Sequence, residues 1–341
     1  KLSLITVFGF FMLSCKVTHN IPENQTPNEE TSKISYKVFV DQNGDFYPDN
    51  GEENYGKHPK KASGKKGAYS LNTLALWKNL SKDLNNFKTE TLSEIENKFK
   101  NKRHTFILIH GYNNSEGEAR TTYNVIKNKI NPNNEDGIIE FYWDGLVAKG
   151  ALGSFDIWFN ATGYSQLAGE RALRSILNLF SNKNIILISH SRGASVVLSS
   201  LSNPPYNKKF AEETYKFHKI NVQNPINLSE NNNIIKILLL APALGFIDFY
   251  KSNYQEIEKN KFRKFSNQVK NIHITVNKDD KILKKYVKKL SSKLNPTDLG
   301  YNIDVFRLLK NQYPNLSMTN YNGLSSHNFL LYINDEKFEE I

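Results

Sequence analysis

The sequence is poor in cysteine and has no internal repeat, and each absence excludes certain kinds of protein or site. Its 341 residues contain one cysteine, which excludes internal disulfides and metal sites built from several cysteines. Zinc-finger spacing and the aromatic signature of RNA-binding domains are also missing. The formal net charge of +11 comes from lysines scattered among many asparagines, which is typical of a solvated surface. We therefore expect no nucleic-acid partner, no metal and no other cofactor.

The single cysteine, Cys15, follows an apolar run at the start of the sequence. Leu2–Leu13 is too short to span a bilayer as a helix but suits the hydrophobic part of a signal peptide. Met12–Cys15 (MLSC) resembles the lipobox of bacterial lipoproteins. We expect residues 1–15 to be a signal peptide with a lipidated Cys15, and polar residues 16–34 to be a flexible tether. The protein would then be lipid-anchored in a bacterial cell envelope, on the outer membrane or another extracytoplasmic face; a conventional cleaved signal is the alternative.

Residues 35–102 are expected to form a small N-terminal hairpin and helical extension. The pair Asn43-Gly44 between two apolar segments is a strong hairpin signal, and helical spacing follows over Leu71–Phe99. The same turn can be interpreted as a calcium loop, but Phe46 stands where such a loop needs glycine for its bend, so we favour the hairpin. The apolar segments are Tyr36–Val40 and Phe46–Tyr47, and the calcium alternative would use Asp41, Asn43, Asp45, Asp49 and Glu52.

From Arg103 onward, segments typical of strands alternate with segments typical of helices. This alternation predicts one α/β domain over 103–341, with a mostly parallel, doubly wound sheet and helices on both faces. Ser115 and Glu118 form a capping box that opens the first helix. The expected strands are Thr105–Ile109, Ile138–Trp143, Ile185–Ser189, Ile234–Leu240, Ile272–Val276 and Ser317–Tyr321.

The segment Ile185–Leu198 (IILISHSRGASVVL) is the most informative part of the sequence. A run of β-branched and leucine residues stops at Ser191 and continues as an apolar helical pattern. A serine on a tight strand-to-helix turn needs small residues two positions before and after it, and Ser189 and Gly193 meet that need. Glycine is usual at the first of these positions, so Ser189 is a departure. The segment predicts a nucleophile elbow, with an ordinary strand-to-helix turn as the alternative.

A loop with a helix close behind it follows the first expected strand. This loop, His110–Asn114 (HGYNN), presents backbone N–H groups to one point, as a developing oxyanion requires. We expect the N–H groups of Tyr112 and Arg192 to be the oxyanion donors. His110 is expected to hold the loop by hydrogen bonds, and His190 to point away from the position of a general base.

A serine nucleophile needs a general base that a third group orients. His327 follows the last expected strand in SSHNFL, and the adjacent Asp279 and Asp280 follow the strand before it in NKDDKIL. The order serine, aspartate, histidine is that of the α/β-hydrolase arrangement. All three positions fall at carboxyl ends of strands, where open sheets bind ligands.

Thr105–Leu330 resembles the serine α/β hydrolases of the lipase and esterase kind through HGYN, SHSRG, DDKIL and SHNFL. The resemblance implies an α/β-hydrolase fold in which Ser191 is the nucleophile and His327 is the general base and acid. It favours Asp280 as the residue that orients the histidine, because the family often has an aspartate followed by one residue and two aliphatics. Asp279 stays open as the alternative.

Residues 143–164 lie between a strand and a helix and have no steady period. In this fold such an insertion often caps the site as a lid, and a buried loop is the alternative. Trp143, Phe155 and Trp158 are candidates for substrate contact. Asp144 and Asp248, near the ends of expected strands, are weaker candidates for the same role.

We therefore expect a serine esterase that cleaves a carboxylic ester of a lipid or acylated small molecule through an acyl-enzyme on Ser191. The alternatives are a thioesterase or amidase of the same fold, and a surface binding protein that keeps the fold without activity. Acyl length, leaving group and oligomeric state do not follow from the sequence.

Overall fold

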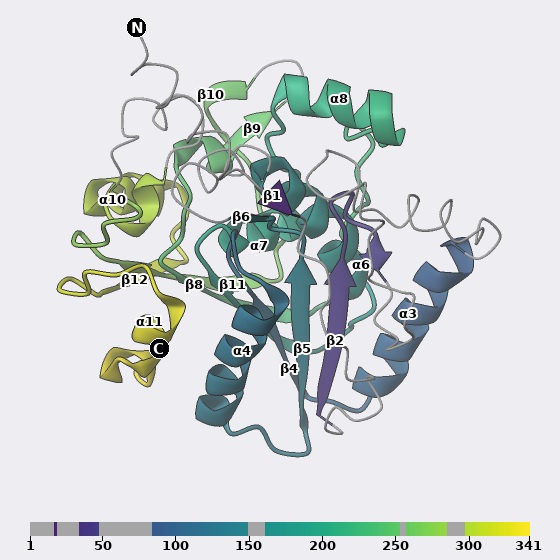
Figure 1. Cartoon of the computed structure of the whole chain (residues 1–341), viewed down its shortest axis with the longest axis horizontal. Coiled ribbons are helices and arrows are strands. Elements are labelled where there is room, and N and C mark those ends of the chain that lie inside the picture. The colour runs from purple at the N-terminus through teal and green to yellow at the C-terminus, as the bar shows by residue number, and fades with distance from the viewer. Residues whose placement is uncertain (1–16, 19–33, 48–83, 149–160, 253–256, 285–296) are drawn as a thin grey trace, which may run out of the picture.

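The centre of the protein is an eight-stranded sheet with the order β12-β11-β8-β7-β4-β5-β2-β3 (Figure 1). The computed structural model describes residues 17–18, 34–47, 84–148, 161–252, 257–284 and 297–341. Neighbouring strands are parallel throughout this sheet except for β3, which is antiparallel to β2. Its strands are β2 (Ser35–Val40), β3 (Phe46–Tyr47), β4 (His104–Ile109), β5 (Asp136–Trp143), β7 (Asn184–His190), β8 (Ile234–Leu240), β11 (Val269–Val276) and β12 (Leu316–Asn320).

The central strands are apolar because both faces of the sheet are covered. Parallel strands buried on two sides need nearly continuous apolar runs, and β7 and β8 have them in IILIS and IIKILLL. The predicted mostly parallel, doubly wound α/β sheet is confirmed. β8 has the predicted bounds, and the other five predicted strands begin and end within three residues of the prediction.

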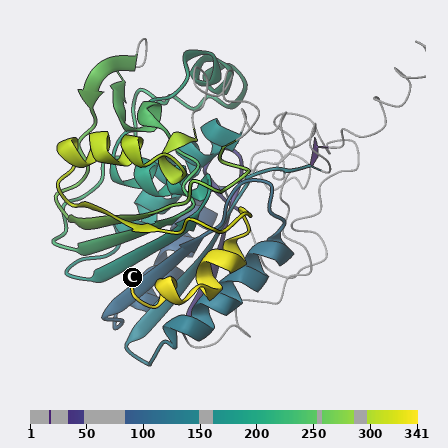
Figure 2. The ribbon, with the colours of Figure 1, turned by 90° about the vertical axis from the view of Figure 1, so that its left-hand side faces the viewer.

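Helices pack on both faces of the sheet, and the strand residues divide between two cores accordingly. In β4, Ile107 and Ile109 join one core and Leu108 the other. The first core includes residues of α3, α6, α7 and α10, and the second includes residues of α4 and α11, which lie side by side (Figure 2). The helices are α3 (Leu84–Phe99), α4 (Glu116–Ile130), α6 (Arg174–Leu177), α7 (Gly193–Leu201), α8 (Lys208–His218), α10 (Ile303–Gln312) and α11 (Phe329–Asn334).

Short helical segments complete the described chain. The predicted capping box at the start of α4 is present, with Ser115 and Glu118 bonded to each other's backbone. A π-helical segment precedes α6 directly. The short segments are η2 (Ala168–Leu173), η3 (Phe246–Phe249), η4 (Asp298–Gly300) and η5 (Glu336–Phe338).

The predicted N-terminal hairpin is confirmed, and it lies at the edge of the main sheet. β2 pairs in parallel with β5, from Ser35 opposite Ile138 to Val40 opposite Trp143. Asp41 shapes the turn, because its Oδ1 accepts from the N–H groups of Asn43 (2.8 Å) and Asp45 (3.0 Å). Asp45 also pairs with Arg171 at 2.6 Å. Asp49 and Glu52, the other ligands of the calcium alternative, lie outside the described residues.

Two small antiparallel pairs lie outside the main sheet. β1 (Val17–Thr18), within the expected tether, pairs with β6 (Val147–Ala148), and β9 (Tyr250–Ser252) pairs with β10 (Ile257–Phe262). None of the described helices is long and apolar enough to cross a bilayer. Cys15 and the expected signal segment lie outside the described residues.

Candidate active site

Ser191 stands on a strained turn between β7 and α7. Its φ is +52°, a left-handed conformation that non-glycine residues rarely adopt. The end of β8 holds this turn: the Ser191 N–H donates to the Leu240 carbonyl (3.0 Å), and the Ser191 carbonyl accepts from the Ala243 N–H (3.1 Å). The segment Ile185–Leu198 thus forms the predicted strand, tight turn and helix.

Two glycines allow backbone to approach this turn closely. A Cβ on Gly193 would lie 2.4 Å from the His110 carbonyl oxygen, so a side chain there would push α7 away from the end of β4. A Cβ on Gly111 would lie 2.9 Å from the Ser191 Cβ. The loop after β4 and the serine turn are therefore in direct contact, as the prediction of an oxyanion site requires.

His327 and Asp280 complete a chain of hydrogen bonds that starts at Ser191. His327 Nε2 lies 2.8 Å from Ser191 Oγ, and His327 Nδ1 lies 2.7 Å from Asp280 Oδ2. Because a carboxylate only accepts, Nδ1 carries the proton and Nε2 is free to accept from the serine hydroxyl. Ser191 and Asp280 are buried, and His327 is 12% exposed. The three side chains have the geometry in which a histidine can take the serine proton.

Asp280 is fixed as an ionised carboxylate. Burial raises its pKa, but the hydrogen bond from His327 and the electrostatic interaction with that ring, together with the hydrogen bonds from Leu283 and Tyr332, outweigh burial. The net pKa lies below the usual value. The Leu283 N–H also donates to Asp280 Oδ1 (3.0 Å), and the Tyr332 hydroxyl donates to Oδ2 (3.0 Å). Tyr332 was not predicted as part of the site; it lies on α11, the helix that directly follows the His327 loop.

The structure distinguishes between the two candidate acids. Asp279 Oδ2 accepts from the Gly323 N–H (2.9 Å), so this side chain holds the loop after β12. Asp280, and not Asp279, contacts His327.

His190 supports the His327 loop from the side. Its ring stacks on Phe329 (centroids 4.5 Å apart, 11° between planes), and its Nε2 donates to the His327 carbonyl (3.0 Å). Burial, together with the neighbouring His327, holds the pKa of His190 well below its usual value. His190 is thus a neutral ring that fixes the backbone of His327.

His110 holds the loop after β4, as the sequence predicts. Its Nε2 accepts from the Trp143 N–H (3.2 Å), so its Nδ1 carries the proton and donates to the Gly111 carbonyl (2.7 Å). Burial lowers the pKa of His110 to about 4. The predicted oxyanion donor Tyr112 follows Gly111 in this loop, and the Asn113 N–H donates to the Gly145 carbonyl (3.2 Å).

Arg192, whose N–H is the second predicted oxyanion donor, uses its side chain to lock the turn. Its guanidinium is buried and pairs with Asp248 at 2.9 Å, and it also donates to the Ala243 carbonyl (3.0 Å). Asp248 Oδ2 accepts from the Gly245 N–H as well (2.9 Å). Asp248, considered from the sequence as a substrate contact, is instead a buried counterion of Arg192, because both side chains are removed from solvent.

The predicted substrate contacts fall in different places. Trp143 is in the core and stacks on His110. Its indole N–H donates to the His110 carbonyl (2.8 Å), so Trp143 holds the start of the loop after β4. Its contact with a substrate stays a prediction. Asp144 is buried and accepts from the Leu146 N–H (3.2 Å). Phe155, Trp158 and most of the expected lid lie outside the described residues.

Across the described part of the chain, no group of three or more His, Cys, Asp or Glu side chains could hold a metal ion. The hydrogen-bonded arrangement offers the chemistry of an oriented serine hydroxyl, an imidazole and a carboxylate.

Comparison with known proteins adds a family. A family model described as "Alpha/beta hydrolase of unknown function (DUF900)" matches residues 87–298, which include Ser191 and Asp280 but not His327. No curated protein matches the chain. A solved structure of a lipase-esterase related protein from Clostridium acetobutylicum ATCC 824 is similar to it, with 14% identity, coverage of 71% of this chain and 93% of that chain, and a TM-score of 0.29.

Proposed function

Since the chain belongs to the alpha/beta hydrolase family of unknown function DUF900, we propose that it is a serine hydrolase that cleaves a carboxylic ester. The observation that carries this proposal is the unbroken chain of hydrogen bonds from Ser191 Oγ through His327 to Asp280, at 2.8 and 2.7 Å. A serine is a weak nucleophile at its own pKa and needs this kind of base and orienting group.

In the proposed reaction, Ser191 Oγ attacks the ester carbonyl while His327 Nε2 takes the hydroxyl proton. Asp280 keeps Nδ1 protonated and stabilises the imidazolium that forms. The C–O bond to the alcohol then breaks, and His327 gives its proton to the departing alcohol oxygen. His327 then deprotonates a water that attacks the acyl carbonyl. The bond between the acyl carbon and Ser191 Oγ breaks, His327 returns the proton to Oγ, and the acid leaves.

The negative oxygen of each tetrahedral intermediate needs donors on the opposite side from the base. We assign this role to the N–H groups of Tyr112 and Arg192, which support it by position: Tyr112 is next to Gly111, the residue against Ser191, and Arg192 follows Ser191 directly. Donors of this kind contribute on the order of 10²–10³-fold to turnover each.

For the substrate, we propose an ester of a lipid or an acylated small molecule. The support comes from the sequence: the aromatic segment 143–164 and the lipobox-like MLSC ending at Cys15, which would hold the protein at a membrane of the cell envelope.

The experiment that tests the proposed activity is labelling of the purified full chain by a fluorophosphonate probe, which reacts only with an activated serine. We expect labelling of the parent and of Ser195→Ala, which changes a buried serine of α7, the helix after Ser191. We expect no labelling of Ser191→Ala. A panel of p-nitrophenyl esters of short, medium and long acyl chains, with matched thioesters and amides, then defines the substrate. A folded parent that neither labels nor hydrolyses any of them would favour a noncatalytic binding protein.

A further inference from the structure

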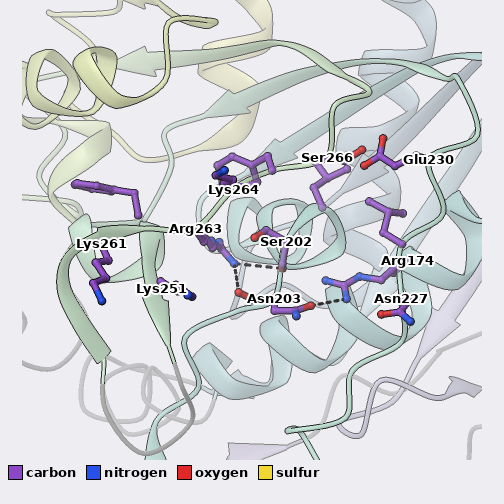
Figure 3. Close-up of a pocket in the computed structure, with 14 residues that line it drawn as sticks. Arg174, Ser202, Asn203, Asn227, Glu230, Lys251, Lys261, Arg263, Lys264 and Ser266 are labelled. Carbon is purple, nitrogen blue, oxygen red and sulfur yellow. Dashed lines mark hydrogen bonds between the residues drawn. The ribbon is translucent and has the colours of Figure 1, made fainter.

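A cavity lies at the far end of α7 from Ser191. Its volume is about 760 Å³, and it opens between the carboxyl end of α7 and the β9–β10 pair (Figure 3). Ser191 precedes the nine-residue α7 and Ser202 follows it, so the two sites are about 14 Å apart along the helix axis at 1.5 Å per residue. The cavity is therefore separate from the candidate active site.

Positive charge dominates the lining of this cavity. Among the described residues, five basic side chains and one acidic side chain, Glu230, contribute to it. The apolar part of the wall includes Phe262, Phe265 and Leu228. The lining therefore combines a cationic surface with an apolar one, as an anionic ligand with an apolar body would require. The basic residues are Arg174, Lys251, Lys261, Arg263 and Lys264.

Arg174 makes four hydrogen bonds within the protein itself. Its Nε and Nη2 donate to the carbonyls of Ser200 (3.0 Å) and Ser199 (2.6 Å), and its Nη1 donates to Asn203 Oδ1 (2.8 Å) and to the Ile226 carbonyl (2.6 Å). A cation at the carboxyl end of a helix satisfies carbonyls that have no partner within the helix. Arg174 thus closes α7 with four of its five N–H groups, and at most one N–H of Nη2 is left for a ligand.

Arg263 makes fewer hydrogen bonds than Arg174, although it is also buried, with 5% exposure. Within the described part of the chain, hydrogen bonds are made by its Nη1 alone, to the carbonyls of Ser202 and Asn203, both at the long distance of 3.4 Å (Figure 3). Among the described residues, Nε has no acceptor at all. Burial also lowers the pKa of this guanidinium to about 10, with Asp248 opposing the shift. A buried guanidinium with so few acceptors is costly to the folded chain, and an anion in the cavity would supply what it lacks.

We propose that this cavity binds a phosphate ester, with the phosphoryl group on Arg263, Lys251 and Lys264 and the apolar body against Phe262 and Phe265. Planar guanidinium and ammonium groups are the usual partners of phosphate oxygens. The ligand is either a soluble phosphate ester or the headgroup of an anionic phospholipid, which present the same phosphoryl chemistry. This site does not depend on the proposed esterase activity.

The test is a calorimetric titration of the full chain with phenyl phosphate, carried out at low and at high salt. We expect saturable binding that weakens with salt, and an affinity at least about tenfold lower in Arg263→Gln, which removes a charge-assisted hydrogen bond. Because Arg263 is buried, the exposed double variant Lys251→Ser/Lys264→Ser provides a second measurement that leaves the interior intact. The matched control Lys100→Ser/Lys208→Ser removes the same charge from exposed residues outside the cavity lining and should bind within about twofold of the parent.

Two further arms distinguish the alternatives. Ser191→Ala should bind phenyl phosphate as the parent does, because the site is separate from the active serine. Co-sedimentation with phosphatidylcholine vesicles, with and without phosphatidic acid, separates a lipid source from a soluble one. Binding to acidic vesicles that Lys251→Ser/Lys264→Ser loses supports the headgroup. If the parent saturates with neither probe, or if the cavity variants bind both as the parent does, the proposal is overturned.

Discussion

Gly111 packs against Ser191 so closely that a Cβ on the glycine would lie 2.9 Å from the Ser191 Cβ and 3.3 Å from His190 Nδ1. Cβ atoms essentially never approach another heavy atom so closely, so a side chain at this position would move the loop or the serine. The loop carries Tyr112, a proposed oxyanion donor. The absence of a side chain at Gly111 therefore lets the loop with Tyr112 lie directly against the Ser191 turn.

Gly111→Ala should lower kcat on the order of 10²-fold, since a displacement near 1 Å in a catalytic constellation has that effect. Gly117→Ala is the matched control, because a Cβ there meets nothing within 4 Å and alanine is the better helix former by about 0.5–1 kcal/mol. The measurements are ester hydrolysis and urea unfolding of both variants. Equal kcat in Gly111→Ala and the parent would show that the contact does not matter to turnover.

Asp280→Asn should lower kcat by about 10³–10⁴-fold, because an amide no longer selects the tautomer with a proton on His327 Nδ1. Asp279→Asn removes the same charge one residue away, where the side chain accepts only from the Gly323 N–H among the described residues, and should stay within a few fold of the parent. Steady-state kinetics on one ester compares the two. The reverse ranking would transfer the orienting role to Asp279.

Ser191→Ala and His327→Ala should each remove most of the turnover, on the order of 10³-fold or more, and the double variant should be little worse than either. The residues act as one unit, so their separate losses do not add. Parallel kinetics on the three variants tests this. A double variant with the product of the two losses would contradict a shared role.

Asp248→Asn should destabilise the fold by about 3–5 kcal/mol, since it leaves the buried Arg192 guanidinium without its counterion. Replacing both partners by apolar residues, as in Arg192→Met/Asp248→Leu, should recover part of that loss. Asp304→Asn breaks the exposed pair with Arg307 and should cost less than about 1 kcal/mol. Urea unfolding at neutral pH measures all three, and equal losses for the buried and exposed pairs would reject this explanation.

His110 makes stability depend on pH. Its pKa is about 4 in the folded protein and about 6.5 in an unfolded chain, so between these values only the unfolded chain is protonated. Stability should therefore fall as pH decreases through this range, and His110 alone should cost about 2 kcal/mol between pH 8 and pH 5. His110→Gln should show a shallower pH dependence of the unfolding free energy, with His190, whose pKa is lowered too, supplying part of the remainder. Identical pH dependences in the parent and His110→Gln would contradict this account.

The sequence predicted the parts of the fold whose signals are local. The apolar run before Ser191 and the small residues around it define a strand and a turn without any reference to distant contacts, and β8 was predicted with its observed bounds. The order of Ser191, Asp280 and His327 also followed from the positions of predicted strand ends. The choice of acid did not follow from these positions, because Asp279 and Asp280 follow the same strand and a family resemblance alone favoured Asp280. In the structure Asp280 contacts His327 and also accepts from Leu283 and Tyr332.

Pairings between distant segments escaped prediction. β2 reads as a hairpin strand, yet it pairs with β5, whose sequence begins about a hundred residues later. Local pattern specifies a strand but not its neighbour. The β9–β10 pair was missed because its strands are short and rich in polar residues, without the alternation that marks a strand. The counterion role of Asp248 depends on Arg192, which lies 56 residues away in the chain.

His327 follows β12, the edge strand that comes last in the sequence among the strands of the main sheet. This position has a consequence for the order of events during synthesis. During translation, the loop bearing Ser191 emerges 136 residues before the imidazole it contacts. A nascent chain that ends before β12 contains the segment of the serine turn but not His327. In the proposed mechanism, the Ser191 hydroxyl therefore has no general base until the chain beyond β12 has been made and folded.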